Sequence, residues 1–229
     1  MAQPSPSYTV ALHLEVPASQ KAVTTLVDTA SATGAIVNGV DVADTDGDTL
    51  VVDLTADTRD SKHRAELVEA LGAIDGVVVH NVGDSTFMAH VGGKISTASK
   101  YPIHNRRDLA RVYTPGVARV CKAIYDHPER ARQLTIKKNT VAVVTDGTAV
   151  LGMGDIGPSA AMPVMEGKAV LFKQFGDVDA WPVALDTKDP EEIVSIVKAI
   201  APAYGGINLE DIAAPKCFDI EARLREELD

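Results

Sequence analysis

Residues 112–117 read Val112-Tyr113-Thr114-Pro115-Gly116-Val117 and set an isolated tyrosine directly before a predicted helix. Pro115 suits the first helical position because its missing N–H has no partner there, and Thr114 is a favourable cap. Apolar residues follow at positions 117, 120, 121 and 124, which is helical spacing. We therefore predict a helix with one apolar face. Its free N–H groups would attract a carboxylate, and Tyr113 would stand beside that carboxylate with a proton to donate.

Two later segments carry candidate catalytic and metal-binding side chains. Lys168 begins an otherwise apolar run, so its amine either reaches the surface or points into a polar pocket, where it could serve as a base. Glu210 and Asp211 end a predicted strand, and two carboxylates favour a hard divalent cation such as Mg²⁺ or Mn²⁺. A third ligand has to come from elsewhere. The alternatives are a surface lysine at a helix end and a solvated acidic turn.

The segment Gly152-Met153-Gly154-Asp155-Ile156-Gly157 matches the GxGxxG pattern of dinucleotide-binding loops. That pattern should follow a buried strand and open a long helix. Here the preceding strand is short, and Pro158 and Pro163 disturb the region in which the helix should run. We favour a glycine-rich turn that lets backbone segments approach closely, with nucleotide binding by this loop as the alternative.

Composition excludes several classes of function. The chain has 229 residues and a net charge of −10, which argues against nucleic acid or anionic membranes as partners because both need basic patches. No apolar run approaches the ~18 residues of a membrane span, and the N-terminus lacks a signal-peptide pattern. The two cysteines, Cys121 and Cys217, set no disulfide framework. We therefore predict a soluble protein of the reducing cytoplasm.

The fold class is expected to be α/β in two domains, residues 8–86 and 101–229, with a linker at 87–100. The first domain shows the order βαββαβ, the ferredoxin-like arrangement of a sheet with helices on one face. Its strands are expected at 8–16, 36–42, 50–55 and 77–82, and its helices around 22–32 and 62–71. The second domain alternates strands at 141–144, 149–151, 181–185 and 207–209 with helices around 168–175 and 190–200.

Four segments of the second domain, in this order and spacing, resemble the N-terminal domain of bacterial malic enzymes. The segments are Asp108–Ala118, Thr145–Gly157, Met165–Ala169 and Asn208–Ile212. By its βαββαβ order, the first domain resembles an ACT domain, a small-molecule-sensing module that some bacterial malic enzymes carry. ACT modules often place a glycine in the first strand–helix loop for a ligand, whereas the loop here is Pro17-Ala18-Ser19-Gln20.

The resemblance implies oxidative decarboxylation of malate to pyruvate with NAD or NADP and a divalent metal, Mg²⁺ or Mn²⁺. Matched motif by motif, Tyr113 takes the position of the general acid and Lys168 that of the general base. Glu210 and Asp211 take the positions of two metal ligands. Lysine would accept the hydroxyl proton as hydride leaves to the nicotinamide, and the metal would stabilise the enolate left by CO₂. Tyrosine would then protonate the enol carbon.

In the family, a nicotinamide-binding domain that carries the third metal ligand should follow the last helix of this sequence. We therefore expect these 229 residues to be a truncated form or the amino portion of a longer enzyme, inactive alone. The alternative is a regulatory or assembly module, in which an ACT sensor joins an incomplete catalytic domain. We also expect a homodimer or higher homo-oligomer, and a small-molecule effector at residues 8–86.

Overall fold

The computed structural model describes residues 3–228 and divides into two compact units, unit 1 up to Gly92 and unit 2 from Gly93. Unit 1 contains, in order, β1 (Ser5–Pro17), α1 (Ala22–Ala32), β2 (Ile36–Asp46), β3 (Thr49–Thr58), α2 (Ser61–Gly72), β4 (Val78–Asp84) and α3 (Ser85–His90). The first six elements follow the expected order βαββαβ. Their strands form one sheet in the order β2-β3-β1-β4, with every neighbouring pair antiparallel.

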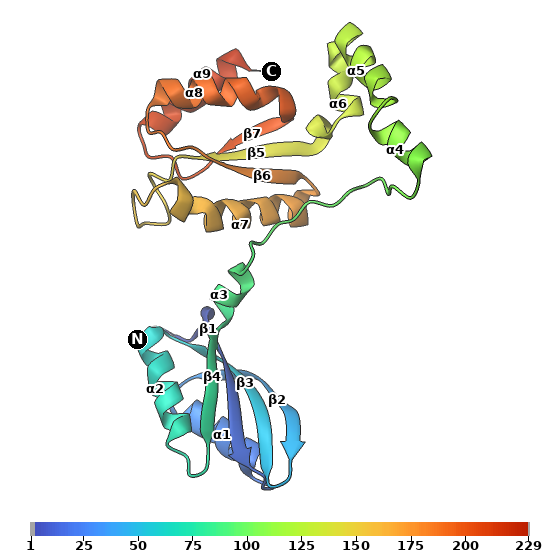
Figure 1. Ribbon diagram of the computed structural model, residues 1–229. Helices are drawn as coiled ribbons and strands as arrows, with labels where there is room; N and C mark the ends of the chain where they lie inside the picture. The colour runs from blue at the N-terminus through green and yellow to red at the C-terminus, as the bar shows by residue number, and fades with distance from the viewer. Residues whose placement is uncertain (1–2, 229) are drawn as a thin grey trace. The chain divides into compact units, whose positions relative to one another are not determined.

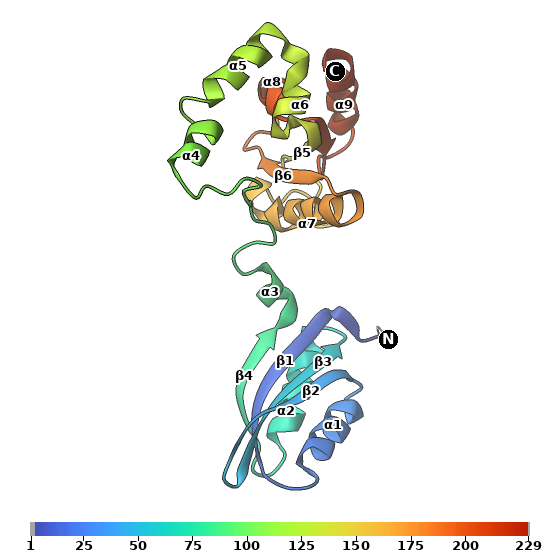
Figure 2. The same ribbon diagram turned by 90° about the vertical axis from the view of Figure 1, so that its right-hand side faces the viewer.

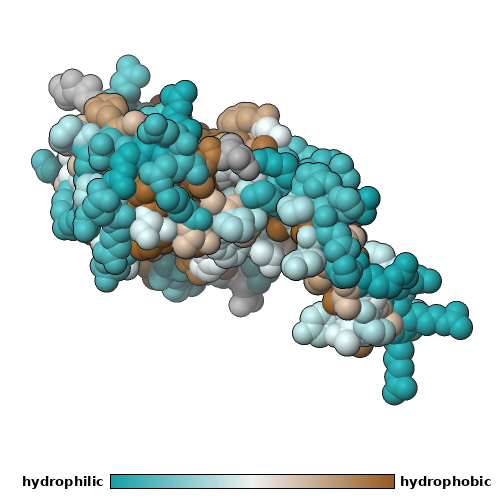
Figure 3. Space-filling view, turned by 90° about the horizontal axis from the view of Figure 1, so that it is seen from above, coloured by the Kyte–Doolittle hydropathy of each residue, from teal (hydrophilic) through white to brown (hydrophobic). Residues whose placement is uncertain are grey.

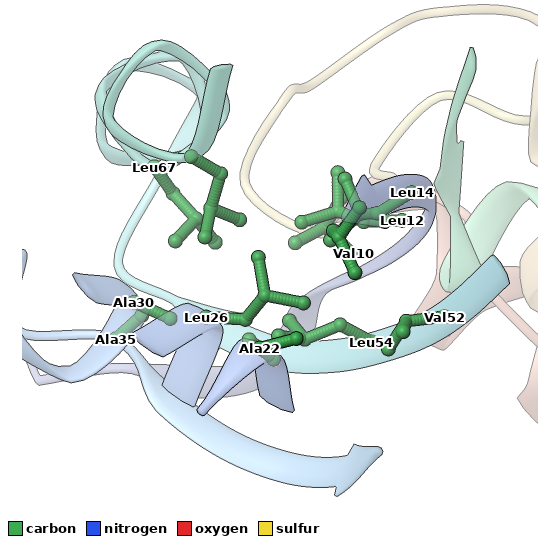
Figure 4. Close-up of a cluster of buried hydrophobic side chains, with 13 residues drawn as sticks. Val10, Leu12, Leu14, Ala22, Leu26, Ala30, Ala35, Val52, Leu54 and Leu67 are labelled. Atoms are coloured by element: carbon green, nitrogen blue, oxygen red, sulfur yellow. The ribbon is translucent and has the colours of Figure 1, made fainter. Parts of the chain in front are cut away.

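The core of unit 1 lies between this sheet and its two longer helices. Alternate residues of β1 point inward because successive side chains of a strand face opposite sides. Val10, Leu12 and Leu14 are thereby buried, and Leu26 of α1 and Leu67 of α2 pack on the same face, as Figure 4 shows. The other face of the sheet is polar. There the His13 ring nitrogen Nδ1 lies 2.6 Å from Asp53 Oδ1.

Unit 2 is an α/β unit around a short parallel sheet. Its elements are α4 (Arg106–Val112), α5 (Val117–Asp126), η1 (Pro128–Arg130), α6 (Ala131–Leu134), η2 (Ile136–Asn139), β5 (Thr140–Thr145), α7 (Pro158–Gly176), β6 (Asp179–Ala184), α8 (Pro190–Ile200), η3 (Ala201–Ala203), β7 (Gly206–Leu209) and α9 (Lys216–Glu227). The strand order is β6-β5-β7, with β5 parallel to both neighbours. Helix α7 covers one face, and α8 and α9 cover the other (Figure 1). The α/β class expected for the chain is confirmed.

The two ends of the parallel sheet differ in character. At the carboxyl edge, the loops after β5 and β7 carry the acidic residues of the candidate site. Toward the other end lie the helices of residues 106–139, here called the helical arm, of which α4 and α5 stand apart from the sheet in Figures 1 and 2. None of the arm's helices buries a residue.

The helix predicted to begin at Pro115 begins instead at Val117. The N–H of Tyr113 donates to the carbonyl of Leu109 at 2.9 Å and so closes α4. The N–H of Gly116 donates to the carbonyl of Ala110 at 2.8 Å. Residues 113–116 are therefore the turn between α4 and α5. No side chain caps α5, so the capping role assigned to Thr114 is wrong.

Two further expectations about the second domain are wrong. Residues 149–151 form a turn rather than a strand, in which the N–H of Val150 donates to Gly154 O at 3.0 Å. Helix α7 begins ten residues earlier than expected and runs through Pro163, because a proline inside a helix removes one donor without having to end the helix. None of the helices in residues 3–228 has the length and apolar character needed to span a bilayer.

Candidate active site

The carboxyl edge of β7 turns sharply at the two predicted metal-binding residues. The N–H of Glu210 still continues the sheet, donating to Val144 O at 2.8 Å. Asp211 then adopts a left-handed conformation, with φ of 53°, and its carbonyl accepts from the N–H of Ala149 at 3.0 Å. This break removes the strand alternation that would place neighbouring side chains on opposite faces.

The structure brings Lys168 to Glu210. Lys168 lies in α7, and its Nζ is 3.1 Å from Oε2 of Glu210. The same oxygen accepts a hydrogen bond from Nδ2 of Asn208 at 3.0 Å. The side chains of Lys168 and Glu210 are 34% and 20% exposed, so they are sheltered but within reach of a small molecule. Lys168 is therefore not the freely exposed surface lysine of the alternative interpretation.

Asp211 has a buried carboxylate oxygen, Oδ2, that accepts no hydrogen bond. Burial raises the pKa of Asp211, and the charge of Glu210 raises it further, whereas Lys168 partly offsets both. An unsatisfied buried oxygen beside a second carboxylate suits a hard cation. Among residues 3–228 no group of three or more His, Cys, Asp or Glu side chains is placed to hold a metal ion. The pair therefore fits two positions of a metal site, and such a site would need a further ligand beyond those gathered here.

Tyr113 is not brought to Lys168 within the chain. It follows α4 in the helical arm and is 67% exposed, whereas Lys168 of α7 contacts Glu210 after β7. Helix α4 stands away from α7 and β7 in Figure 1. Three of the four predicted site residues thus gather at one edge of the sheet, and the predicted acid lies outside that group.

The glycine-rich loop differs in two ways from expectation. Gly152, Gly154 and Gly157 have positive φ values, and the space where a Cβ would be is open. Glycine therefore suits these positions because of the backbone conformation and not because of close packing. Close approach occurs at Gly147, where a Cβ would lie 2.2 Å from the carbonyl oxygen of Gly157. The loop does connect β5 to a long helix within a parallel βαβ unit, so the argument from a missing helix is wrong.

Three of the six backbone amides of residues 152–157 are nevertheless hydrogen-bonded internally. The N–H groups of Ile156 and Gly157 both donate to the carbonyl of Gly147 at 3.1 Å, and the N–H of Met153 donates to Val150 O at 2.8 Å. A phosphate-binding loop needs such amides to point at the ligand. The internal hydrogen bonding therefore favours a structural turn.

Two interactions near the site were missed from the sequence. Asp146 is buried directly after β5 and forms an ion pair with Lys216 at the start of α9. The feature of the sequence that could have pointed to this ion pair is an acidic residue immediately after a buried strand. Within the segment expected to be a linker, the N–H of Lys94 donates to Glu166 Oε2 at 2.9 Å and its Nζ to Pro163 O at 2.7 Å. These contacts hold the chain on α7 near Lys168.

Comparison with known proteins identifies the family. Residues 92–192 and 187–225 match the family model "Malic enzyme, N-terminal domain". A Geobacillus stearothermophilus NAD-dependent malic enzyme is 60% identical over 213 residues, which are 92% of this chain and 45% of that protein. An Escherichia coli NADP-dependent malic enzyme is 49% identical over 139 residues, 61% of this chain and 18% of that protein. The chain thus spans less than half the length of these relatives.

Solved structures agree with this result. The NAD-dependent malic enzyme of Thermotoga maritima superimposes with a TM-score of 0.62 at 52% identity, covering 64% of this chain and 41% of that one. The malic enzyme of Pyrococcus horikoshii gives a TM-score of 0.59 at 56% identity, covering 60% of this chain and 32% of that one. The sequence match spans more than half of the 229 residues, and the chain belongs to the malic enzyme family, as a part that contains the family's N-terminal domain.

Proposed function

We propose that the protein containing this chain converts malate and NAD(P)⁺ to pyruvate, CO₂ and NAD(P)H, and that unit 2 binds the malate. The observation that carries the proposal is the contact between Lys168 and Glu210 at the carboxyl edge of a parallel sheet, where ligands of α/β folds bind. The relatives named above include both NAD- and NADP-dependent enzymes, so the proposal covers either nucleotide.

Lys168 is the proposed base of this reaction. Its amine is sheltered beside the Glu210 carboxylate, and in its neutral form it would accept the proton of the malate hydroxyl. Glu210 and Asp211 would hold a divalent cation, Mg²⁺ or Mn²⁺, together with a ligand from outside residues 3–228. When bound, such a cation supplies polarisation of the hydroxyl and carbonyl oxygens of the substrate. Asp211 suits this role because its buried Oδ2 lacks a partner.

Tyr113 is the proposed acid, and we propose that it acts in the site of a second copy of the chain. The helical arm exposes large apolar side chains that a lone chain would leave in water. They include Leu109, Val112, Tyr125, Leu134 and Ile136. Figure 3 shows the arm projecting at the right, with hydrophobic patches between hydrophilic side chains. A second copy would cover these patches and could carry Tyr113 to a Lys168 that its own chain does not reach.

Charge supports the same arrangement. The arm, residues 106–139, contains nine Lys or Arg residues and three Asp or Glu residues, whereas the whole chain has a net charge of −10. The remainder of the chain is therefore strongly acidic, and Glu210, Asp211 and Asp155 lie in the loops at the carboxyl edge. A basic arm and an acidic edge are complementary surfaces for association between copies.

For unit 1 we propose an ACT-type, ferredoxin-like module that binds a small-molecule effector and contributes to assembly. Support comes from the βαββαβ order with strand order β2-β3-β1-β4. The polar open face of the sheet and its two edge strands are surfaces that a second copy could cover. We also propose a cytoplasmic location, because Cys121 and Cys217 are both unpaired.

The test is malate-dependent formation of NADH or NADPH by the full-length protein with Mg²⁺ or Mn²⁺. We expect turnover that chelation of the metal abolishes and that release of pyruvate accompanies. Metal-independent turnover, or oxidation of malate without CO₂ release, would contradict the proposal.

A further inference from the structure

We infer that Asp146 and Lys216 are positioning residues that fix the Glu210–Asp211 turn in the geometry for metal binding. The inference rests on the proposed function, because it concerns the metal ligands of that site. Asp146 follows the central strand β5, and Lys216 is the first residue of α9. Neither side chain is among the proposed ligands, so their burial at this edge needs another explanation.

The ion pair is almost fully removed from water. The side chain of Asp146 is completely buried and that of Lys216 is 20% exposed, and Nζ of Lys216 contacts Oδ2 of Asp146. Nζ also donates to the carbonyl of Lys188 at 3.3 Å. A buried ion pair stabilises a fold less than well-packed apolar residues of similar volume often do. A role in orienting neighbouring groups accounts for it better than stability alone.

A chain of hydrogen bonds leads from this pair to the loop after β7. The other carboxylate oxygen of Asp146, Oδ1, accepts from the N–H of Thr148 at 3.1 Å and from its hydroxyl at 2.6 Å. Because that hydroxyl donates to Asp146, its lone pairs are free to accept, and Oγ1 takes the N–H of Ala213 at 2.9 Å. The charge of Asp146 thus determines which way the Thr148 hydroxyl points.

These contacts enclose Asp211 on both sides. Its carbonyl accepts from Ala149, next to Thr148, while Ala213 and Lys216 are tied to Thr148 and Asp146. Asp211 itself has the left-handed φ of 53°, which a non-glycine residue seldom adopts unless its surroundings impose it. We conclude that the Asp146–Thr148 segment holds the turn that aims the Asp211 carboxylate.

The experiment measures Mn²⁺ binding to the full-length protein by electron paramagnetic resonance of the free ion. Asp146→Asn keeps the shape and removes the charge, and Thr148→Val removes the hydroxyl that joins Asp146 Oδ1 to the N–H of Ala213. The matched control is Arg223→Met, which breaks another contact of α9, the hydrogen bond from Nη2 of Arg223 to Glu191 Oε2 at 2.9 Å on α8. We expect each of the two test variants to bind Mn²⁺ about 10–100-fold more weakly, and the control to bind as the wild type does.

The outcomes separate this inference from the function on which it rests. Wild-type Mn²⁺ affinity in Asp146→Asn and Thr148→Val, even with a lower Tm, would overturn the positioning role and leave the metal site standing. Absence of Mn²⁺ binding by the wild-type protein would overturn both. Thr148→Val keeps the buried ion pair, so its result is readable even if Asp146→Asn folds poorly.

Discussion

Nζ of Lys168 and Oε2 of Glu210 lie 3.1 Å apart, so a residue of α7 and a residue after β7 meet over the carboxyl edge of the sheet. Removing Lys168 should abolish the reaction by removing the proton acceptor. We expect kcat for malate oxidation by Lys168→Met to fall by about 10²–10⁴-fold, as the loss of a general base does. The control is Lys173→Met on the same helix, whose Nζ contacts Asp177 and Asp179 instead and which should keep its rate. A rate near that of the wild type in Lys168→Met would show that the base is misassigned.

Sharing of the site between two copies can be tested by mixing inactive variants. Lys168→Met and Tyr113→Phe should each be inactive as homodimers. Co-refolded or co-expressed, they should recover roughly a quarter of wild-type activity, since random pairing makes half of the dimers mixed and each mixed dimer has one complete site. If Tyr113 served its own chain, the mixture would stay inactive. Sedimentation of each variant alone checks that dimers still form.

The 229 residues by themselves should not reduce NAD⁺ or NADP⁺ with malate. Residues 3–228 place no group of three metal ligands together, and the N–H groups of Met153, Ile156 and Gly157 in the loop 152–157 already donate to backbone carbonyls. The assay compares NAD(P)H formation by this chain and by the full-length protein at equal Mn²⁺ concentrations. Metal-dependent turnover by the 229-residue chain would contradict the expectation.

Deletion of unit 1 should spare the basal reaction, and a cut that leaves Lys94 in place should give the more stable protein. Removing residues 1–91 of the full-length protein should change subunit number or effector response and leave kcat largely intact. Removing residues 1–95 also takes away the hydrogen bonds from Lys94 to Glu166 and Pro163. Each such bond contributes about 0.5–1.5 kcal/mol, so the longer deletion should lower Tm further. Loss of activity in the shorter deletion would mean that unit 1 helps to build the site.

The ion pairs of Lys173 with Asp177 and Asp179 should make the stability of the fold depend on pH in a defined direction. The hydrogen bond from Lys173 lowers the pKa of Asp179. The stabilisation that this pair contributes is therefore present above the ordinary carboxyl range, and it is lost as pH falls through the lowered pKa. Lys173→Met should therefore lower Tm slightly at neutral pH, with a difference that fades from about pH 5 downward. The control is Lys62→Met, which removes a looser exposed pair whose Nζ lies 3.7 Å from Glu66. An unchanged difference in acid would rule out the ion pair as its cause.

The sequence predicts local order well where a pattern repeats. Alternation of Val10, Leu12 and Leu14 marks a strand with one buried face, and the structure confirms it. Prolines were misleading, because Pro163 lies inside α7 and Pro115 lies in the turn before α5. A proline limits its own φ and removes one donor, and neighbouring residues decide whether a helix continues.

The candidate site was only partly predictable for a different reason. The spacing of Glu210 and Asp211 showed two carboxylates at a strand end, but the contact of Lys168 with Glu210 depends on how α7 crosses the sheet. The position of Lys168 in the sequence favoured its interpretation as a surface residue. The position of Tyr113 could not be predicted from the sequence. An apolar stripe such as that of α5 indicates that another surface covers the helix, but it does not indicate which chain provides that surface.

If the helical arm carries Tyr113 into the site of a second copy, as proposed, catalysis should depend on how much of the protein is present. A site that draws Tyr113 from one chain and Lys168 from another exists only in the associated form. Specific activity should then fall on dilution and recover on concentration. Well below the dissociation constant of the dimer, output would rise with the square of protein abundance, so a cell could adjust flux through a modest change in expression.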